Sequence, residues 1–147
     1  MSYGTCKLRT ISLLKNVNIV IESNRSEIKR IEELLIEITS ECNLDLEKLV
    51  NFQIAVSEAL LNAIVHGNKE DNSKRVFCDI KCTEDKLTVK IRDEGKGFNF
   101  DEVPDPTSDE NILKEHGRGI FIIRSLVDDC KCIASDKGTE IILTVNN

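Results

Sequence analysis

Three polar side chains interrupt an otherwise apolar helical segment near the middle of the chain. Between residues 51 and 68, Glu58, Asn62 and His66 recur at intervals of four residues, a spacing that aligns them along one side of a helix. The apolar residues around them indicate that this helix is buried. A buried carboxylate and a buried carboxamide need polar partners. The partners are either other side chains in a closed network or, because small alanines beside the stripe leave space, a bound ligand or a hydrated metal ion.

A short glycine motif follows a strand-like run further along the chain. Asp93, Gly95 and Gly97 form the pattern D-x-G-x-G. One interpretation is a tight turn and nothing more. The other is a nucleotide site, in which the Asp93 carboxylate accepts a hydrogen bond from the exocyclic amine of a purine and the glycines let the backbone approach the base.

A second pair of glycines, Gly117 and Gly119, lies where a loop is expected to become a helix. Free backbone N–H groups and the helix dipole make such a start suitable for phosphate. Arg118 between them either adds positive charge to that site or is simply solvated, and the alternative is a helix start that binds nothing. The chain has no Walker A motif, no dinucleotide-binding glycine triplet and no protein-kinase motif set.

Hydrophobic periodicity predicts the elements that must hold these residues. Asn24 and Glu27 form a capping pair that starts a helix ending near residues 42–43, and Asp45 caps the next helix, which ends near residues 67–68. A third, apolar helix opens at the second glycine pair. Strand patterns cover residues 17–21, 75–83, 86–92, 130–135 and 139–145. This order predicts an α+β fold of two layers, a mainly antiparallel sheet with helices on one face.

The totals favour a single soluble domain. With 147 residues the chain is long enough for one core, and 31 % charged and 40 % hydrophobic residues are typical of a soluble globular protein. The net charge of −6 argues against direct nucleic-acid binding or an anionic membrane surface and suits a basic protein partner. No apolar run of membrane-spanning length and no signal-peptide core are expected, so the predicted compartment is the cytoplasm.

The six cysteines do not have the spacing of a metal site. Cys78 and Cys82 lie in one strand-like run and Cys130 and Cys132 in another, and neither pair forms a C-x-x-C knuckle. We therefore expect reduced thiols that pack in the core rather than a structural zinc site. The remaining two cysteines carry no pattern that can be interpreted.

Taken together, the motifs are more specific than any one of them. The order E-x-x-x-N on a helix, D-x-G-x-G after a strand, a long loop and G-x-G at a helix start resembles the nucleotide-binding fold of the gyrase, Hsp90, histidine kinase and MutL superfamily. SEALLNAIVHGN (57–68) is similar to the N box of the anti-sigma factor serine/threonine kinases, IRDEGKGF (91–98) to their G1 box and HGRGIFIIRSLVDD (116–129) to their G2 box.

The resemblance implies a two-layer α/β sandwich of the Hsp90 and histidine-kinase (Bergerat) type. It covers an ATPase domain at residues 16–147 and leaves residues 1–15 as an N-terminal extension. The acidic loop with both prolines, residues 99–116, corresponds to a lid that closes over the nucleotide.

The resemblance also implies a role for each matching residue. Asn62 corresponds to the N-box asparagine that ligates Mg²⁺, Glu58 to the general base four residues earlier, and Asp93 to the aspartate that recognises adenine. His66 is expected to have a structural role or to lie just behind the ligand-binding residues. The nucleotide-binding residues implied are Asn62, Asp93, Gly95, Gly97, Gly117, Arg118, Gly119 and Thr139, the last through a water at the adenine.

The implied function is that of an ATP-dependent serine/threonine kinase and anti-sigma regulatory factor. Such a protein uses ATP and Mg²⁺, phosphorylates an antagonist of the sulfate-transporter and anti-sigma antagonist (STAS) type, binds a sigma factor or another regulated protein, and forms a homodimer. Two alternatives stay open: a non-catalytic, ATP-gated partner-binding module, and the catalytic domain of a split histidine kinase. The spare G2 box, which lacks the G-x-G-x-G run of histidine kinases, argues against the second alternative.

Overall fold

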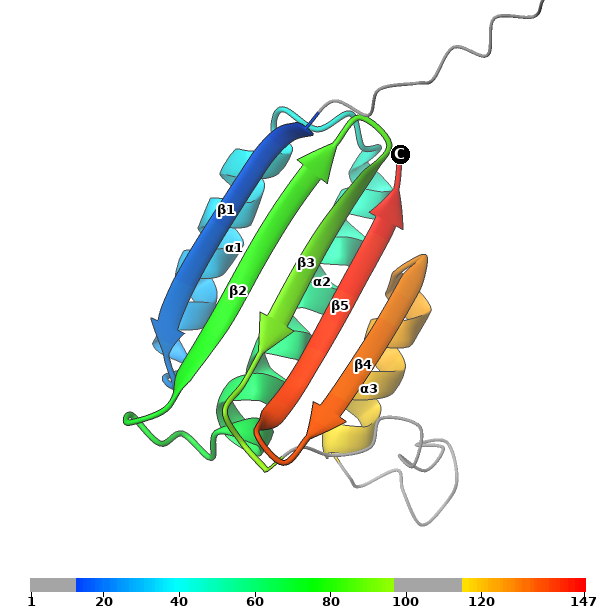
Figure 1. Cartoon of the computed structure of the whole chain (residues 1–147). Helices are drawn as coiled ribbons and strands as arrows, with labels where there is room; N and C mark the ends of the chain where they lie inside the picture. The colour runs from blue at the N-terminus through cyan, green and yellow to red at the C-terminus, as the bar shows by residue number, and fades with distance from the viewer. Residues whose placement is uncertain (1–12, 97–114) are drawn as a thin grey trace, which may run out of the picture.

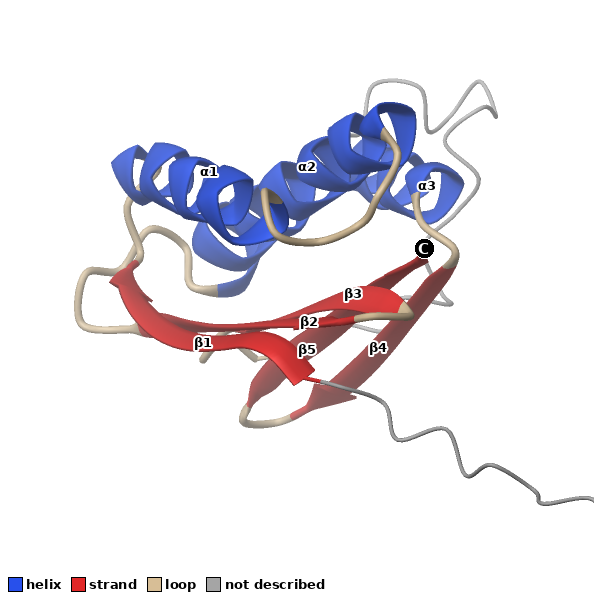
Figure 2. Cartoon of the chain, turned by 90° about the horizontal axis from the view of Figure 1, so that it is seen from above, coloured by secondary structure: helices blue, strands red, loops and turns tan. Residues whose placement is uncertain are grey.

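The computed structural model describes residues 13–96 and 115–147, and these residues form two layers. One layer is a five-stranded sheet, and the helices lie together on one of its faces (Figure 2). The architecture expected from the sequence, an α+β fold with helices on one face of an antiparallel sheet, is confirmed.

The sheet has the strand order β1-β2-β3-β5-β4, and each neighbouring pair is antiparallel (Figure 1). Its strands are β1 Leu13–Glu22, β2 Arg75–Thr83, β3 Lys86–Arg92, β4 Asp129–Ser135 and β5 Gly138–Asn146. The bounds of β2 and β3 agree with those expected, whereas β1 begins four residues before its expected start. Since Arg92 at the end of β3 pairs with Glu140 of β5, the register brings Asp93 beside the start of β5.

Alternation along the central strands creates the core. In β2 the side chains of Val76, Cys78 and Ile80 are fully buried under the helices, and the residues between them point to the other face. On that other face lies a depression of about 270 Å³ lined by Phe77, Asp79, Lys90, Arg92 and Glu140. Of its lining residues, only Arg92 belongs to one of the sequence motifs, where it precedes Asp93. The Arg92 guanidinium stacks on the Phe77 ring, 4.4 Å from the ring centroid.

The helical layer contains α1 Ser26–Thr39, α2 Leu46–Leu61, a π-helical turn η1 Asn62–Gly67 that continues α2, and α3 Glu115–Leu126. The Asp45 side chain accepts a hydrogen bond from Lys48 N, 2.9 Å away, which confirms the expected cap of α2. The prediction that Asn24 and Glu27 form a capping pair at the start of α1 is wrong. The Asn24 side chain accepts a hydrogen bond from Ser26 N, and among the described residues no side chain caps this helix. α1 also ends at Thr39, earlier than expected.

The π-helical turn changes the expected polar stripe. A regular α-helix continues only to Leu61, and the wider turn begins at Asn62. Glu58 and Asn62 therefore keep their α-helical relationship, while His66 lies within the wider turn. Short π-helical insertions are often found at functional sites, where they re-aim side chains.

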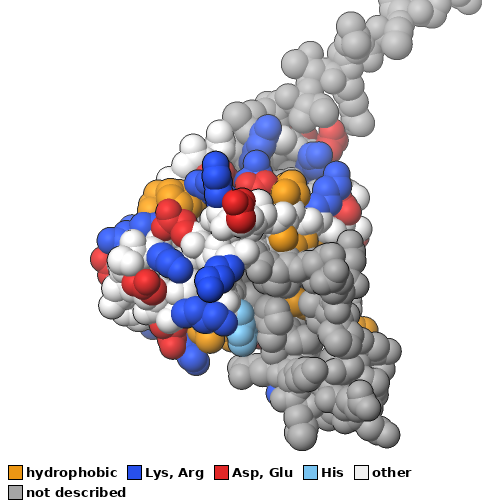
Figure 3. Space-filling model, turned by 60° about the horizontal axis from the view of Figure 1, so that its bottom comes forward, with side chains coloured by type: hydrophobic (Ala, Val, Ile, Leu, Met, Phe, Trp, Pro, Cys, Tyr) orange, Lys and Arg blue, Asp and Glu red, His pale blue; other side chains and the backbone are white. Residues whose placement is uncertain are grey.

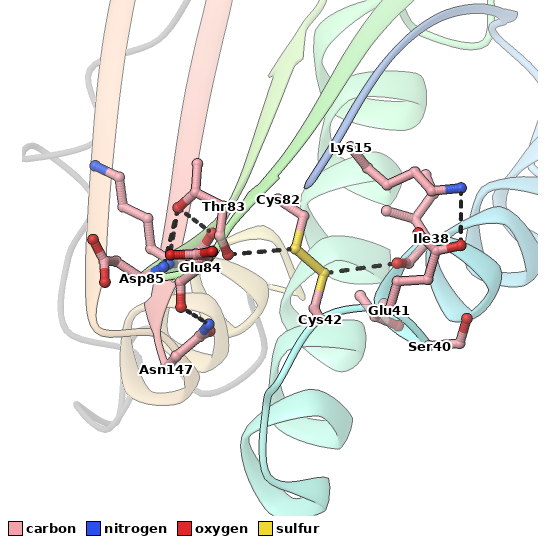
Figure 4. The surroundings of a disulfide bond; sticks show 12 residues. Lys15, Ile38, Ser40, Glu41, Cys42, Cys82, Thr83, Glu84, Asp85 and Asn147 are labelled. Carbon is pink, nitrogen blue, oxygen red and sulfur yellow. Dashed lines mark hydrogen bonds and ion pairs between the residues drawn. A yellow bond between two sulfur atoms is a disulfide. The ribbon is translucent and has the colours of Figure 1, made fainter. Parts of the chain in front are cut away.

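A disulfide between Cys42 and Cys82 corrects the expectation that the core cysteines are reduced. It joins Cys42, three residues after the end of α1, to the last but one residue of β2, with the two Cα atoms 6.6 Å apart (Figure 4). The chain positions are 40 residues apart, so sequence spacing could not reveal the pair. Cys78 remains a buried thiol, and burial raises its pKa to about 12, so it is protonated and unreactive at neutral pH.

The continuous helical segment Leu46–Gly67 is, by length and composition, apolar enough to cross a membrane, which corrects the expectation that no such run exists. Its apolar character has another explanation. Phe52, Val56 and Leu60 on this segment are fully buried against the sheet and the neighbouring helices.

Candidate nucleotide-binding site

The three sequence motifs converge at one end of the molecule. The end of β3, the start of β5, the end of η1 and the start of α3 all lie at the lower end in Figure 1. Antiparallel pairing of β3 with β5 brings the G1 residues beside Thr139, and the contact of α3 with α2 brings the G2 residues to the N box.

The carboxylate of Asp93 is held by backbone N–H groups. Its Oδ1 accepts hydrogen bonds from Gly95 N at 2.9 Å and from Thr139 N at 3.2 Å. Asp93 N in turn donates to Thr139 O at 3.0 Å. Because one carboxylate oxygen is committed to these two bonds, the other, Oδ2, keeps its capacity to accept a bond from a ligand.

Close backbone approach shapes the space beside Asp93. A Cβ atom on Gly95 would lie 2.2 Å from the backbone oxygen of Gly67, and a Cβ on Gly67 would lie 2.3 Å from Asp93 Oδ2. Neither position can hold a larger side chain without movement of the backbone or of the Asp93 carboxylate. The two glycines therefore let the end of η1 and the turn after β3 pack closely around the Asp93 carboxylate.

Burial raises the pKa of Asp93 above its ordinary value of 3.8, although the bonds from Gly95 and Thr139 and the nearby Lys74 ammonium act in the opposite direction. The carboxylate is thus partly desolvated. A hydrogen bond from a ligand to a desolvated carboxylate is stronger than one made in water.

Glu58 and Asn62 lie together against the start of α3. A Cβ on Gly119 would be 3.0 Å from Glu58 Oε2 and 3.5 Å from Asn62 Oδ1, so both side-chain oxygens face the same point on the α3 backbone. Asn62 is buried, and in the part of the chain that the structure describes its Nδ2 has no hydrogen-bond partner. A buried, unpaired amide is costly, and such atoms mark places where a ligand binds.

This pair of oxygens fits the requirements of Mg²⁺. Mg²⁺ prefers oxygen ligands, takes only one or two from the protein, and completes its shell with water and substrate phosphates. Asn62 Oδ1 can supply one such ligand with the Glu58 carboxylate beside it, and the unpaired Asn62 Nδ2 can donate to a phosphate oxygen. Within the described residues no cluster of three or more His, Cys, Asp or Glu side chains offers a competing metal site.

The other predicted residues are placed as follows. Thr139 is buried at the start of β5, and Arg118 is exposed on α3. Gly117 is the third residue of α3 and lies in its first turn, where backbone N–H groups have no partner within the helix, and Gly119 lies two residues later. Gly97 and most of the predicted lid fall outside the described residues.

Charged side chains of both signs lie at this end of the molecule. Figure 3, in which this end comes forward, shows lysine and arginine side chains interspersed with aspartate and glutamate side chains. The positive charge of Lys74 acts to lower the pKa of Asp93, against the larger effect of burial.

Gly67 and Asn68 also complete the site, although neither was predicted to have a role of its own. From the sequence they are the end of a helix and the last two residues of the N box. Gly67 faces the Asp93 carboxylate. The Asn68 side chain accepts a hydrogen bond from the backbone N–H of Glu94, the residue after Asp93. The signal that could have found them is the Gly-Asn pair itself, at the end of a helix that already carries the polar stripe.

Comparison with known proteins identifies the class. A family model described as a histidine kinase-like ATPase domain matches residues 21–145, and the chain belongs to this family. A structure containing the RsbU and RsbW domains of a Mycobacterium tuberculosis protein superposes with a TM-score of 0.63 over 89 % of this chain and 32 % of that longer chain. At 18 % sequence identity this similarity shows the fold alone.

Curated relatives place the chain more closely within the family. It is 34 % identical over 101 residues to an anti-sigma F factor of Clostridium perfringens, covering 67 % of this chain and 72 % of the relative. It is also 30 % identical over 115 residues to the serine-protein kinase RsbW of Bacillus subtilis, covering 73 % of this chain and 70 % of that protein. The family resemblance drawn from the N, G1 and G2 boxes is confirmed.

Proposed function

We propose that this chain is an ATP-dependent protein serine/threonine kinase that acts as an anti-sigma regulatory factor. The observation that carries the proposal is the position of Gly119, whose Cα faces both Glu58 Oε2 and Asn62 Oδ1. A phosphate-binding helix start, a carboxylate base and a metal-ligating amide thus meet at one point. The names of the relatives, an anti-sigma F factor and a serine-protein kinase, support the same function.

At the adenine end, Asp93 Oδ2 accepts a hydrogen bond from the exocyclic amino group of the base. Gly95 and Gly67 allow the close backbone packing that holds this carboxylate. The Thr139 hydroxyl takes part through a water molecule. Gly97 belongs to the same loop by its sequence position. This end holds and orients the nucleotide and takes no part in bond making.

At the phosphate end, the first turn of α3, which contains Gly117, supplies backbone N–H groups and the positive end of the helix dipole, and Gly119 lies just after it. Arg118 adds a positive charge at the surface. Asn62 is the residue that would hold Mg²⁺, which neutralises charge on the phosphates when it is bound. Asn62 Nδ2 donates to a phosphate oxygen.

Phosphotransfer needs a base for the substrate hydroxyl. The serine or threonine oxygen of the protein substrate forms a bond to the γ-phosphorus, the bond from that phosphorus to the bridging oxygen breaks, and ADP leaves. The hydroxyl proton passes to the Glu58 carboxylate. Glu58 is suited to this step because it lies on the same helical face as Asn62 and beside the phosphate-binding helix.

The substrate in this proposal is a STAS-domain antagonist, and the regulated partner is a sigma factor or a protein that takes its place. The acidic chain suits a basic partner surface. We also propose a homodimer working in the cytoplasm, with residues 16–147 as the ATPase domain, residues 1–15 as an N-terminal extension and residues 99–116 as the lid.

The test is incubation of the purified chain with Mg²⁺ and [γ-³²P]ATP and each STAS-domain protein from the same genome. One of them is expected to become labelled on a serine or threonine. Glu58→Ala should abolish the label while ATP affinity, measured by calorimetry, stays within about twofold. The matched control is Glu33→Ala, which removes an exposed acidic side chain of α1.

The possible outcomes separate the alternatives. Label that persists in Glu58→Ala would disprove the assignment of the base. ATP binding without label on any STAS protein would favour the non-catalytic, ATP-gated binding module. Label on a histidine of a separate protein would favour the split histidine kinase.

A further inference from the structure

Asn68 is a fully buried polar residue that the proposed mechanism does not use. Its side chain nevertheless makes three hydrogen bonds. Oδ1 accepts from Glu94 N at 2.7 Å, and Nδ2 donates to Ser23 Oγ at 2.9 Å and to Arg75 O at 3.0 Å. One amide therefore joins the end of η1 to the ends of β1 and β2 and to the turn that follows β3.

The bond to Glu94 acts on the turn that holds Asp93. The Glu94 N–H belongs to the peptide group that directly follows Asp93, and the next N–H, that of Gly95, donates to Asp93 Oδ1. The Glu94 carboxylate also accepts from Arg75 N at 2.6 Å. Asn68 thus holds the peptide group after Asp93, and Thr139 holds Asp93 from the neighbouring strand. Together these bonds orient the carboxylate with Oδ2 toward Gly67.

The backbone fixes Asn68 itself. Asn68 N donates to Ala63 O at 2.8 Å and Glu70 N donates to Ile64 O at 2.8 Å, which closes the π-helical turn. The next two residues, Lys69 and Glu70, both have φ near 56°, in the left-handed region that non-glycine residues rarely adopt. Such strain persists only where surrounding bonds impose it, and it is common at functional sites.

We propose that Asn68 is a positioning residue for recognition of the nucleotide base. By holding the Glu94 N–H it sets Asp93 Oδ2 at the place where the exocyclic amino group of adenine donates. The inference rests on the proposed function, in which Asp93 recognises adenine. The last residue of the N box would then contribute to selection of the base, whereas Asn62 on the same helical segment acts at the phosphates.

The test compares two nucleotides that differ only at the group Asp93 recognises. Binding of ATP and of purine riboside triphosphate, which lacks the 6-amino group, is measured by calorimetry well below the unfolding midpoint of each variant. The wild-type chain should prefer ATP by about tenfold or more, because the bond is made to a charged, partly buried acceptor. Asn68→Ala should reduce this ratio of the two affinities to below about threefold, mainly by weakening the binding of ATP.

The matched control is Ser23→Ala, which removes one acceptor from Asn68 Nδ2 and leaves the bond to Glu94 N in place. It should lower stability and keep the preference for ATP. Asn68→Asp retains an oxygen acceptor for Glu94 N and should keep at least half of the wild-type ratio. This variant decides the question by itself if Asn68→Ala does not fold.

The outcomes separate this inference from the proposed function. A wild-type chain that binds the two nucleotides equally would show that Asp93 does not recognise the amino group, and the proposed function would fail at that point. If the wild type prefers ATP and Asn68→Ala keeps that preference, the role of Asn68 is overturned and the proposed function stands. The same conclusion follows if Asn68→Asp loses the preference. A preference lost equally in Ser23→Ala and Asn68→Ala would indicate only a general loss of structure.

Discussion

Asn62 and Asn68 lie at the two ends of the same π-helical turn, and both side chains are buried. The Asn68 amide makes three hydrogen bonds within the chain, whereas Asn62 Nδ2 has none among the described residues. Asn62 belongs to the phosphate end of the site and Asn68 to the adenine end. The same residue type is therefore fully paired in one half of the site and left unpaired in the other.

The difference reflects what each half must do. The adenine end recognises a small neutral group by the direction of one hydrogen bond, so its acceptor must be rigid before the ligand arrives. The phosphate end binds charged groups and Mg²⁺, which bring strong interactions of their own, and its polar atoms stay available for them. The adenine end therefore stabilises the fold, whereas the phosphate end lowers its stability until a ligand binds there.

The strongest test of this comparison replaces each asparagine by leucine, which has a similar size and no polar atoms. Asn68→Leu should lower the free energy of unfolding by about 3 kcal/mol, because the partners at Ser23, Arg75 and Glu94 lose their bonds. Asn62→Leu should leave it unchanged or raise it by up to about 1 kcal/mol, because it removes a buried amide that lacks a partner.

Chemical denaturation of the ligand-free chain measures both values under the same conditions. Nucleotide binding in the presence of Mg²⁺ should be lost in Asn62→Leu despite its stability. If the two variants lose similar amounts of stability, the contrast between the two halves is wrong.

Gly95→Ala tests how rigid the adenine end is. The added Cβ would lie 2.2 Å from the backbone oxygen of Gly67, and a backbone atom cannot move aside as a flexible side chain can. We expect a loss of about 2 kcal/mol in the free energy of unfolding and at least tenfold weaker ATP binding. Thermal unfolding and calorimetry are the measurements, and full retention of both properties would show that the turn can open freely.

Asp93→Asn separates binding from stability. Because burial raises the folded-state pKa of Asp93 above its unfolded value, the folded chain holds the proton more tightly, and the stability contributed by this group falls as pH rises from 3.8 through the folded pKa. At pH 7 the neutral asparagine avoids that cost, so the variant should be at least as stable as the wild type. ATP binding should weaken about tenfold or more, because the amide has only one acceptor oxygen.

The pH dependence of binding provides a second measurement on the same carboxylate. ATP affinity of the wild type should fall as pH is lowered through the raised pKa of Asp93, since protonation converts an acceptor oxygen to a donor. The fall should therefore begin at a higher pH than an ordinary aspartate would give. A wild-type profile that matches the profile of Asp93→Asn throughout would remove Asp93 from the site.

Gly119→Ala should have the smallest effect and tests the adaptable phosphate end. The added Cβ would lie 3.0 Å from Glu58 Oε2, which is the end of a flexible side chain and can move. Since alanine favours helix over glycine, the free energy of unfolding should change by no more than about 1 kcal/mol, in the direction of higher stability. The phosphotransfer rate should fall severalfold as Glu58 is displaced, and steady-state kinetics at saturating ATP measure this.

Local pattern was sufficient for most of the secondary structure. The alternation in residues 75–92 predicted β2 and β3 with their observed bounds, and Asp45 was identified as a helix cap from its type and place. Pattern failed at two places in the helical layer. The Asn24 side chain bonds the nearby Ser26 N instead of forming a capping box, and the helix after Leu61 widens into a π turn that no periodicity reveals.

The sequence by itself determined the kind of chemistry, because residue types at set spacings, Glu58 with Asn62 and Asp93 with its glycines, belong to one recognisable class of site. Only the tertiary structure decided which oxygen of Asp93 is available, that Asn62 lacks a partner, and that Asn68 and Gly67 complete the site. The same holds for the Cys42–Cys82 disulfide. These properties depend on contacts between segments far apart in the chain, and one sequence does not encode such contacts in any local pattern.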